Sequence, residues 1–315
     1  MNYQLGVCFM FDYILKRLFI SVLTLFVIVT ITFFLMHTVP GGPFVGEKPL
    51  SKVALENLNK KYGLDKPLIV QYGNYLKNAI KGDLGTSLTK IGQSVSGTIV
   101  RAFPVSFRLG IFSMFISTTI GVLFGIIAAL RQGKAIDRAV MVAATLGIAV
   151  PSFVVATVSI IIFSVKLKML PAYGFDSFKQ YLMPGFALSF SSLSFMARLM
   201  RSSMLDVIHQ DYIKTAKAKG VSGSIIIFKH ALRNAVIPIV TYIGPLAAGI
   251  LTGSFVVEKI FNIPGLGRYF VESITQRDYP TILGVTIFYG AFLIAMNFLV
   301  DLSYGVIDPR IKIQD

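Results

Sequence analysis

The chain has 315 residues, of which 54% are hydrophobic and 14% are charged, whereas a soluble protein carries about 25% charged residues. Its apolar residues form blocks long enough to cross a bilayer, which takes about 20 residues each, so the composition excludes a soluble globular protein. The formal net charge of +15 lies largely in loops between these blocks, a distribution that sets orientation in a membrane rather than one that binds nucleic acid, and Cys8 as the only cysteine excludes an internal disulfide.

The first apolar block runs from Leu18 to Met36, directly after Lys16 and Arg17. It is longer than the 7–15 residues typical of a signal-peptide core, and no cleavage site of small residues follows it. We therefore expect residues 1–36 to form a cytoplasmic N-terminus and an uncleaved first transmembrane helix. Met10 would serve equally well as a start, and the sequence does not decide between it and Met1.

Residues 37–101 form a long polar loop, which we expect to be extracytoplasmic. Its eight lysines argue only weakly against this location. Basic residues favour the cytoplasmic side mainly in short loops, and segments of this length cross membranes largely regardless of charge. Two short amphipathic helices are predicted within it, over Lys52–Tyr62 and over Pro67–Ile80.

The rest of the chain, residues 102–315, contains five more apolar blocks. Two basic loops between them, 131–138 and 201–234, fall on the same side as Lys16 and Arg17, which is the asymmetry expected of cytoplasmic loops. The predicted fold is an all-α integral membrane protein with six transmembrane helices and both termini cytoplasmic. The five later helices are predicted over Phe107–Leu130, Ala139–Ser164, Tyr181–Met200, Ala235–Val257 and Thr281–Val300.

The loop over residues 201–234 is too polar to lie in a bilayer, yet it keeps a helical rhythm. Gly220 fits a helix end, because glycine reaches the left-handed conformation without strain. Ser222 and Ser224 could cap a second short helix over residues 225–233. A compact pair of helices that a partner could grip is therefore predicted, with Met204, Val207, Ile208, Ile213 and Ala216 on its apolar face and Asp206, His209, Gln210, Lys214 and Lys217 opposite.

The transmembrane blocks carry none of the groups that power transport. Their centres lack Asp, Glu, Lys, Arg and His, the residues that mark ion and proton pathways. The histidines His37, His209 and His230 are far apart and fit no metal-binding pattern, and no nucleophile motif is present. We therefore expect no catalytic residue, no metal site and no cofactor in this chain. A membrane enzyme or a self-standing carrier is the disfavoured alternative.

The segment from Lys214 to Arg233 resembles the coupling loop, or Glu-Ala-Ala loop, of bacterial ABC-importer membrane subunits. Lys214-Thr215-Ala216 stands at Glu-Ala-Ala, Gly220 at the motif glycine, and the segment His230–Arg233 at Ile-x-Leu-Pro. Lys214 for Glu, His230 for Ile and Arg233 for Pro depart from the pattern. The sequence here resembles the peptide-transporter branch of these subunits, in which a basic residue occupies the Glu position.

The resemblance extends over nearly the whole chain. Gly41–Phe44 looks more like oligopeptide than dipeptide or nickel members. Other matching stretches are Tyr13–Arg17, Tyr62–Pro67, Gly82–Gly85, Gly253–Glu258, Ile260, Phe261, Pro264–Gly267 and Asp308–Arg310.

The resemblance implies the B-type permease subunit of a peptide importer in the bacterial cytoplasmic membrane. Implied partners are a homologous C-type permease subunit, two ATPase subunits that bind ATP and Mg, an extracytoplasmic binding protein, the peptide and membrane lipid, with no nucleic acid. A dipeptide, nickel or glutathione importer of the same branch stays open. The residues implied to meet the ATPase are Asp211, Tyr212, Lys214, Thr215, Ala216, Lys217, Lys219, Gly220, His230 and Arg233.

Two weaker predictions concern the predicted helices three and five. Thr252 and Ser254 could line the substrate path, whereas we expect Gly249 and Gly253 to serve close helix packing, because they have the small-x-x-x-small spacing. Gly147 and Pro151 could allow a bend or merely a tolerated kink.

Overall fold

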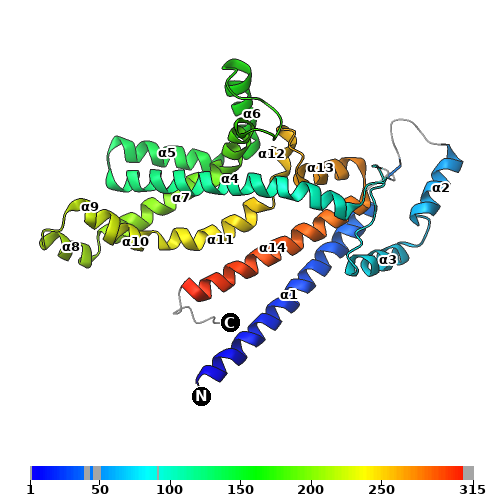
Figure 1. The fold of residues 1–315 in the computed structure, drawn as a ribbon, viewed down its shortest axis with the longest axis horizontal. Coiled ribbons are helices and arrows are strands. Elements are labelled where there is room, and N and C mark those ends of the chain that lie inside the picture. The colour runs from blue at the N-terminus through cyan, green and yellow to red at the C-terminus, as the bar shows by residue number, and fades with distance from the viewer. Residues whose placement is uncertain (1, 39–42, 45–50, 91, 308–315) are drawn as a thin grey trace. The chain divides into compact units, whose positions relative to one another are not determined.

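The computed structural model describes residues 2–38, 43–44, 51–90 and 92–307, with side chains between residues 16 and 300. Over these residues the chain is helical, with two π-helical segments, and its one β-type pairing is an isolated bridge between Thr86 and Ser94. The predicted motifs Gly41–Phe44 and Asp308–Arg310 lie wholly or partly outside the described residues. Figure 1 shows the helices α1 (Asn2–Thr38), α2 (Lys52–Tyr62), α3 (Leu68–Ile80), α4 (Val95–Leu130), α5 (Ala135–Ala149), α6 (Ser152–Ser159), η1 (Ile160–Lys166), α7 (Phe178–Ile208), α8 (Asp211–Ala218), α9 (Gly223–Ile225), η2 (Ile226–Ala231), α10 (Leu232–Ala235), α11 (Ile237–Leu251), α12 (Phe255–Ile260), α13 (Leu266–Gln276) and α14 (Tyr279–Ile307).

In the described part of the chain, three single helices are long and apolar enough to cross a membrane, namely Lys16–Thr38, Val95–Leu130 and Tyr279–Val300. They contain the first, second and sixth predicted spans, and an 18-residue stretch of each has a mean hydropathy of 2.8, 2.2 and 2.0, respectively. The second of them begins at Val95, upstream of the expected start at Phe107.

Two other predicted spans, Ala139–Ser164 and Ala235–Val257, are not continuous helices, and the bend considered at Pro151 is confirmed. α5 ends at Ala149, and its direction differs by 106° from that of the following pair α6–η1. Pro151 stands at the break, where it lacks the backbone N–H that would continue α5. α11 ends at Leu251 and is bent by 44° from the preceding segment α9–α10. Counting each bent pair as one span brings the total in the described residues to five.

The remaining predicted span, Tyr181–Met200, lies inside α7. This helix is long but is not among the apolar spans, because serines interrupt its hydrophobic residues. The six-helix topology therefore stays a prediction. The loop 131–138 is also shorter than expected, since α5 already begins at Ala135.

The described helices form two compact units, one of residues 1–103 with 269–295 and the other of residues 104–268 with 296–315. These units reflect packing, whereas the predicted regions 1–36, 37–101 and 102–315 reflect sides of a membrane. The regional division therefore stays a prediction.

In the first unit, an aromatic cluster packs around the end of α1. Phe33 lies against Tyr72 of α3, and the ring of His37 lies 4.9 Å from that of Tyr279. The predicted amphipathic helices are confirmed as α2 and α3. The Ser51 hydroxyl accepts a hydrogen bond from the Ala54 amide and so caps α2.

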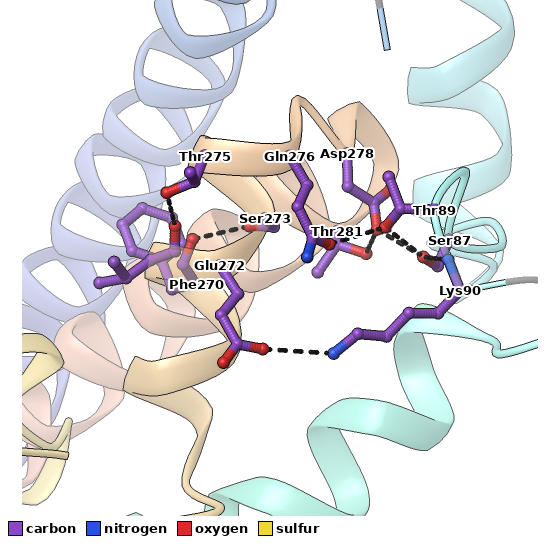
Figure 2. A network of polar contacts seen from close by, with 11 residues as sticks. Ser87, Thr89, Lys90, Phe270, Glu272, Ser273, Thr275, Gln276, Asp278 and Thr281 are labelled. Carbon is purple, nitrogen blue, oxygen red and sulfur yellow. Dashed lines mark hydrogen bonds and ion pairs between the residues drawn. The ribbon is translucent and has the colours of Figure 1, made fainter. Parts of the chain in front are cut away.

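Asp278 ties the loop before α4 to the start of α14 in the same unit. Its buried carboxylate accepts hydrogen bonds from the Ser87 hydroxyl at 2.5 Å, the Leu88 amide at 2.9 Å and the Thr281 hydroxyl at 2.8 Å. Figure 2 shows this network together with the ion pair of Lys90 and Glu272.

In the second unit, α7 is the central helix, and α5, α6, α10 and α11 all pack against it. α4 also lies close to α7, because Gly125 has no side chain. A Cβ atom there would lie 2.5 Å from the Met200 Cβ atom and 2.6 Å from the Ala197 carbonyl oxygen. This tight packing gives the loop after α7 a rigid base.

Candidate functional site

The 201–234 loop begins with a helix break that separates α7 from α8. α7 ends at Ile208, Gln210 occupies the N-cap position in extended conformation, and α8 runs over Asp211–Ala218. Gly220 has φ of +73°, so the predicted left-handed helix end is confirmed.

The second helix of the loop is confirmed over the predicted residues, but it is irregular. Ile226–Ala231 is π-helical and lies between the short helices α9 and α10. The proposed serine cap was wrong in its chemistry: Ser222 occupies the N-cap position without a side-chain hydrogen bond, and Ser224 lies inside α9. The turn is closed instead by backbone bonds, including one from the Val221 amide to the Ala216 carbonyl.

A hydrophobic core underlies this pair of helices. Ile213 of α8 is fully buried, as are Met204 of α7 and Ala231 of η2, while Ile226 is 5% exposed. Val207, Ile208 and Ala216 pack partly buried against the same core, so the predicted apolar face is confirmed.

Two long-range hydrogen bonds join the two ends of the loop. The Ser203 hydroxyl donates to the Ala235 carbonyl at 2.8 Å, and this bond is buried. The Asn234 amide group donates to the Tyr212 hydroxyl at 2.8 Å. The beginning and the end of the loop are therefore held together, and α8 is attached to both α7 and α10.

The opposite face of α8 is exposed and basic. Lys214 forms an ion pair of 2.9 Å with Asp211, but both side chains are largely in solvent, so the pair adds little stability. Of the other residues implied to meet an ATPase, His230 and Ala216 are partly buried, and the exposed ones are Tyr212, Thr215, Lys217, Lys219, Gly220 and Arg233. The structure thus brings the predicted contact residues onto one protruding element.

The base of the loop contains an ion pair that sequence reasoning missed. Arg201 donates from Nε to Asp137 Oδ1 at 2.5 Å and from Nη2 to Asp137 Oδ2 at 2.8 Å. The Gly133 amide donates to the same Oδ2 at 2.9 Å, and Asp137 is 3% exposed. A bidentate arginine–carboxylate pair is geometrically specific, so it fixes the loop 131–138 to the end of α7.

The predicted substrate-path residues lie at the end of α11. The Thr252 hydroxyl donates to the Gly249 carbonyl at 2.9 Å, and Ser254 accepts a bond from the Val257 amide as the cap of α12. The expected close packing is not found at Gly249, where a Cβ atom would meet nothing within 4 Å. At Gly253 it is found against α4, because a Cβ atom there would lie 3.0 Å from the Ser106 Cβ atom, although Gly253 has φ of +85° and lies outside any helix.

Within the described residues, no cluster of three His, Cys, Asp or Glu side chains could hold a metal ion. The 201–234 loop carries an exposed basic face and is anchored on packed helices.

Comparison with protein families decides what kind of protein carries this element. The family model of the binding-protein-dependent transport system inner membrane component matches residues 121–313, and the N-terminal model of the same membrane component matches residues 10–110. The chain belongs to this family of transport-system membrane components.

Individual relatives of this transport-system component are permease proteins. The dipeptide transport system permease protein of Bacillus subtilis is 51% identical over 96% of this chain and 98% of its own length. The oligopeptide transport system permease protein of Haemophilus influenzae is 43% identical over 96% of this chain and all of its own length. The chain is accordingly a multi-pass membrane permease.

A solved structure supports the fold of this permease. The crystal structure of an amino acid ABC transporter with histidines matches with a TM-score of 0.50 and 18% identity, over 65% of this chain and 92% of that one. At this identity the likeness shows a shared fold and nothing of the cargo.

Three buried carboxylates of the permease were missed as structural or functional groups, namely Asp137, Glu258 and Asp278. In the sequence, Glu258 stands out only as the last residue of the stretch Gly253–Glu258 that resembles the importer family. The local signal is weak, because an acidic residue near a loop is usually solvated. The glycines at 253, 265 and 267 were the available hint, since they permit close approach of backbone to a side chain.

Proposed function

We propose that this permease is the B-type transmembrane subunit of an ATP-driven importer that moves oligopeptides across the bacterial cytoplasmic membrane. The compact 201–234 loop, anchored through Ile213 and exposing a basic face, is the observation that supports an externally driven gate. The permease names of the relatives support the transport of peptides.

The proposed assembly contains a second, C-type permease subunit, two ATPase subunits and an extracytoplasmic binding protein that delivers the peptide. ATP and Mg bind to the ATPases. When the ATPase pair closes, it displaces α8, and the buried core beneath α8 passes the displacement to α7 and α10. A packed core transmits such displacement as a rigid-body shift, because it is not continuously deformable.

The topology belongs to the same proposal. Six crossings, with both termini and the 201–234 loop in the cytoplasm, place α8 where ATPases can reach it. The long polar region after α1 then faces the binding protein. Thr252 and Ser254 are proposed to lie beside the peptide path, and the variants Thr252→Ala and Ser254→Ala test this through peptide uptake.

The cargo is a separate part of the proposal. The two relatives are named for dipeptide and for oligopeptide transport. A nickel or glutathione importer is the alternative that the sequence resemblance leaves open. Two measurements on a strain that depends on this permease separate these cargoes. One is growth on peptides of two to six residues, and the other is uptake of metal.

Disulfide-directed crosslinking tests the coupling role. Cys8 is the only cysteine, so a Cys8→Ser background allows single cysteines at Thr215 or Lys219 of the exposed face, with Lys60 on α2 as the control position. We expect Thr215→Cys and Lys219→Cys to crosslink to the ATPase subunit with a yield that depends on ATP. A yield no higher than at Lys60→Cys and indifferent to ATP would refute the coupling role.

A further inference from the structure

The strongest unexplained group in the chain is the carboxyl group of Glu258, on the short helix α12 that follows α11 (Figure 1). Glu258 is 0% exposed. Its Oε2 accepts a hydrogen bond from the Arg268 amide at 3.2 Å, whereas its Oε1 is buried and accepts none. A buried charge with an unsatisfied oxygen is costly, so this environment disfavours the ionised form.

The backbone at three glycines lies close to the carboxyl oxygens of Glu258. A Cβ atom at Gly253 would collide with Oε1, one at Gly265 would collide with Oε2, and one at Gly267 would lie 3.0 Å from Oε2. Three separate glycines therefore allow the chain to close around a single side chain.

Ser106 connects this pocket to α4. Its hydroxyl hydrogen-bonds to the Glu258 carboxyl group, and its oxygen accepts from the Leu266 amide at 2.8 Å. The carboxyl group, α4 and the start of α13 are thus joined at one point. This point holds the 252–268 segment, which begins with Thr252 at the end of α11.

Among the described residues, no neighbouring charge contributes to the pKa of the carboxyl group. α6, which packs against α12, carries no titratable residue, and none of the charged residues on the other neighbouring elements shifts the pKa of Glu258. These residues are Arg101 and Arg108 on α4, Lys179, Arg198, Arg201 and Asp206 on α7, Lys259 on α12, and Arg268 and Glu272 on α13. Burial raises the pKa of Glu258 to about 7, although the hydrogen bonds from Ser106 and from backbone amides lower it.

We propose that Glu258 is a proton-binding site, and that the 252–268 segment is held closed on α4 more strongly when this carboxyl group carries its proton. A proton on Oε1 removes the buried charge and leaves Oε2 free to accept its existing bonds. Loss of that proton favours an open segment in which the carboxylate reaches water. Through its position beside Thr252, the segment would then make the permease sensitive to pH, a consequence that rests on the proposed function.

The direction of the pH effect follows from proton linkage. The pKa of Glu258 in the closed segment is above the value of about 4.3 for an exposed glutamate, so closure is favoured at low pH and weakens as the pH rises to about 7. Above that pH both forms are ionised and the effect levels off. With these two pKa values, opening should increase about tenfold between pH 6 and pH 8.

Hydrogen exchange of the full chain in lipid nanodiscs tests the site without substrate, ATPase or transport. Exchange in residues 252–268 is measured at pH 6 and pH 8 and divided by that of Glu258→Gln at the same pH, which cancels the intrinsic pH dependence of exchange. The neutral amide imitates the protonated carboxyl group. Glu56→Gln on the exposed face of α2 is the matched control.

We expect the exchange ratio of the wild type to Glu258→Gln to rise about tenfold from pH 6 to pH 8, and the ratio of the wild type to Glu56→Gln to stay constant. A constant ratio for Glu258→Gln would overturn the proposal. If Glu258→Gln does not fold, Ser106→Ala provides the second test. Losing the bond that favours the ionised form should move the opening midpoint to higher pH, and an unmoved midpoint would overturn the proposal.

Peptide uptake separates this site from the proposed function. Uptake by the wild type should change between pH 6 and pH 8, and the Glu258→Gln profile should be flat relative to it. A pH-dependent exchange ratio without any peptide uptake would refute the cargo and keep the proton site. Peptide uptake together with a constant exchange ratio would refute the proton site and keep the cargo.

Discussion

Replacing Ile213 by alanine should loosen α8 from the core of the 201–234 loop. The change deletes three carbon atoms from a fully buried side chain, which at about 0.8 kcal/mol per carbon costs about 2.4 kcal/mol before any cavity remains. A cavity beside Met204 and Ile226 increases the cost, and buried isoleucine-to-alanine changes typically cost about 2–5 kcal/mol. This corresponds to local opening that is about 30-fold to several thousandfold more frequent.

Hydrogen exchange of the α8 amides measures this opening directly. Ile225→Ala is the matched control, because the same atoms are removed from a side chain that is 48% exposed. We expect faster exchange in α8 for Ile213→Ala and little change for Ile225→Ala. If the loop couples to an ATPase, Ile213→Ala should also lower peptide uptake more than ATP hydrolysis. Equal exchange in the two variants would refute the anchoring of α8 by Ile213.

Three further substitutions test the packing around the site. Arg201→Ala should lower the midpoint of thermal unfolding, since an uncompensated buried Asp137 costs about 3–5 kcal/mol, whereas Arg198→Ala should change it little; equal effects of the two would contradict the ion pair. Gly125→Ala should lower the same midpoint, because its Cβ atom would overlap α7, and an unchanged midpoint would show that the helices can separate at no cost. Asp278→Asn should cost about 1–3 kcal/mol and make the loop before α4 more sensitive to proteolysis, and unchanged cleavage would show that the carboxylate does not hold that loop.

Features with local signals were predictable from the sequence. α2 has the boundaries expected from its residues, because Ser51 caps its start and Gly63 ends it with φ of +66°. Gly220 ends the first helical part of the 201–234 loop for the same reason. Caps and left-handed glycines act within one helical turn, so the neighbouring residues suffice to predict them.

Breaks inside apolar segments were only partly predictable. Pro151 pointed to a bend, but its size of 106° depends on how both arms pack on α7. The end of α11 at Leu251 was missed, because Thr252, Gly253 and Ser254 are small, uncharged and followed by the apolar residues 255–257. Hydropathy does not distinguish such a span from a turn followed by a short buried helix.

The sequence by itself determined that this chain is a membrane protein, approximately where its apolar helices lie, and which loop carries a helical, basic face. These properties follow from composition and from short periodicities, which are local. Only the tertiary structure decided that Asp137 meets Arg201, that Asp278 holds the loop before α4, and that Glu258 is enclosed by glycines and Ser106. A carboxylate acquires its role from partners distant in sequence, and a single sequence does not state which distant residues will surround it.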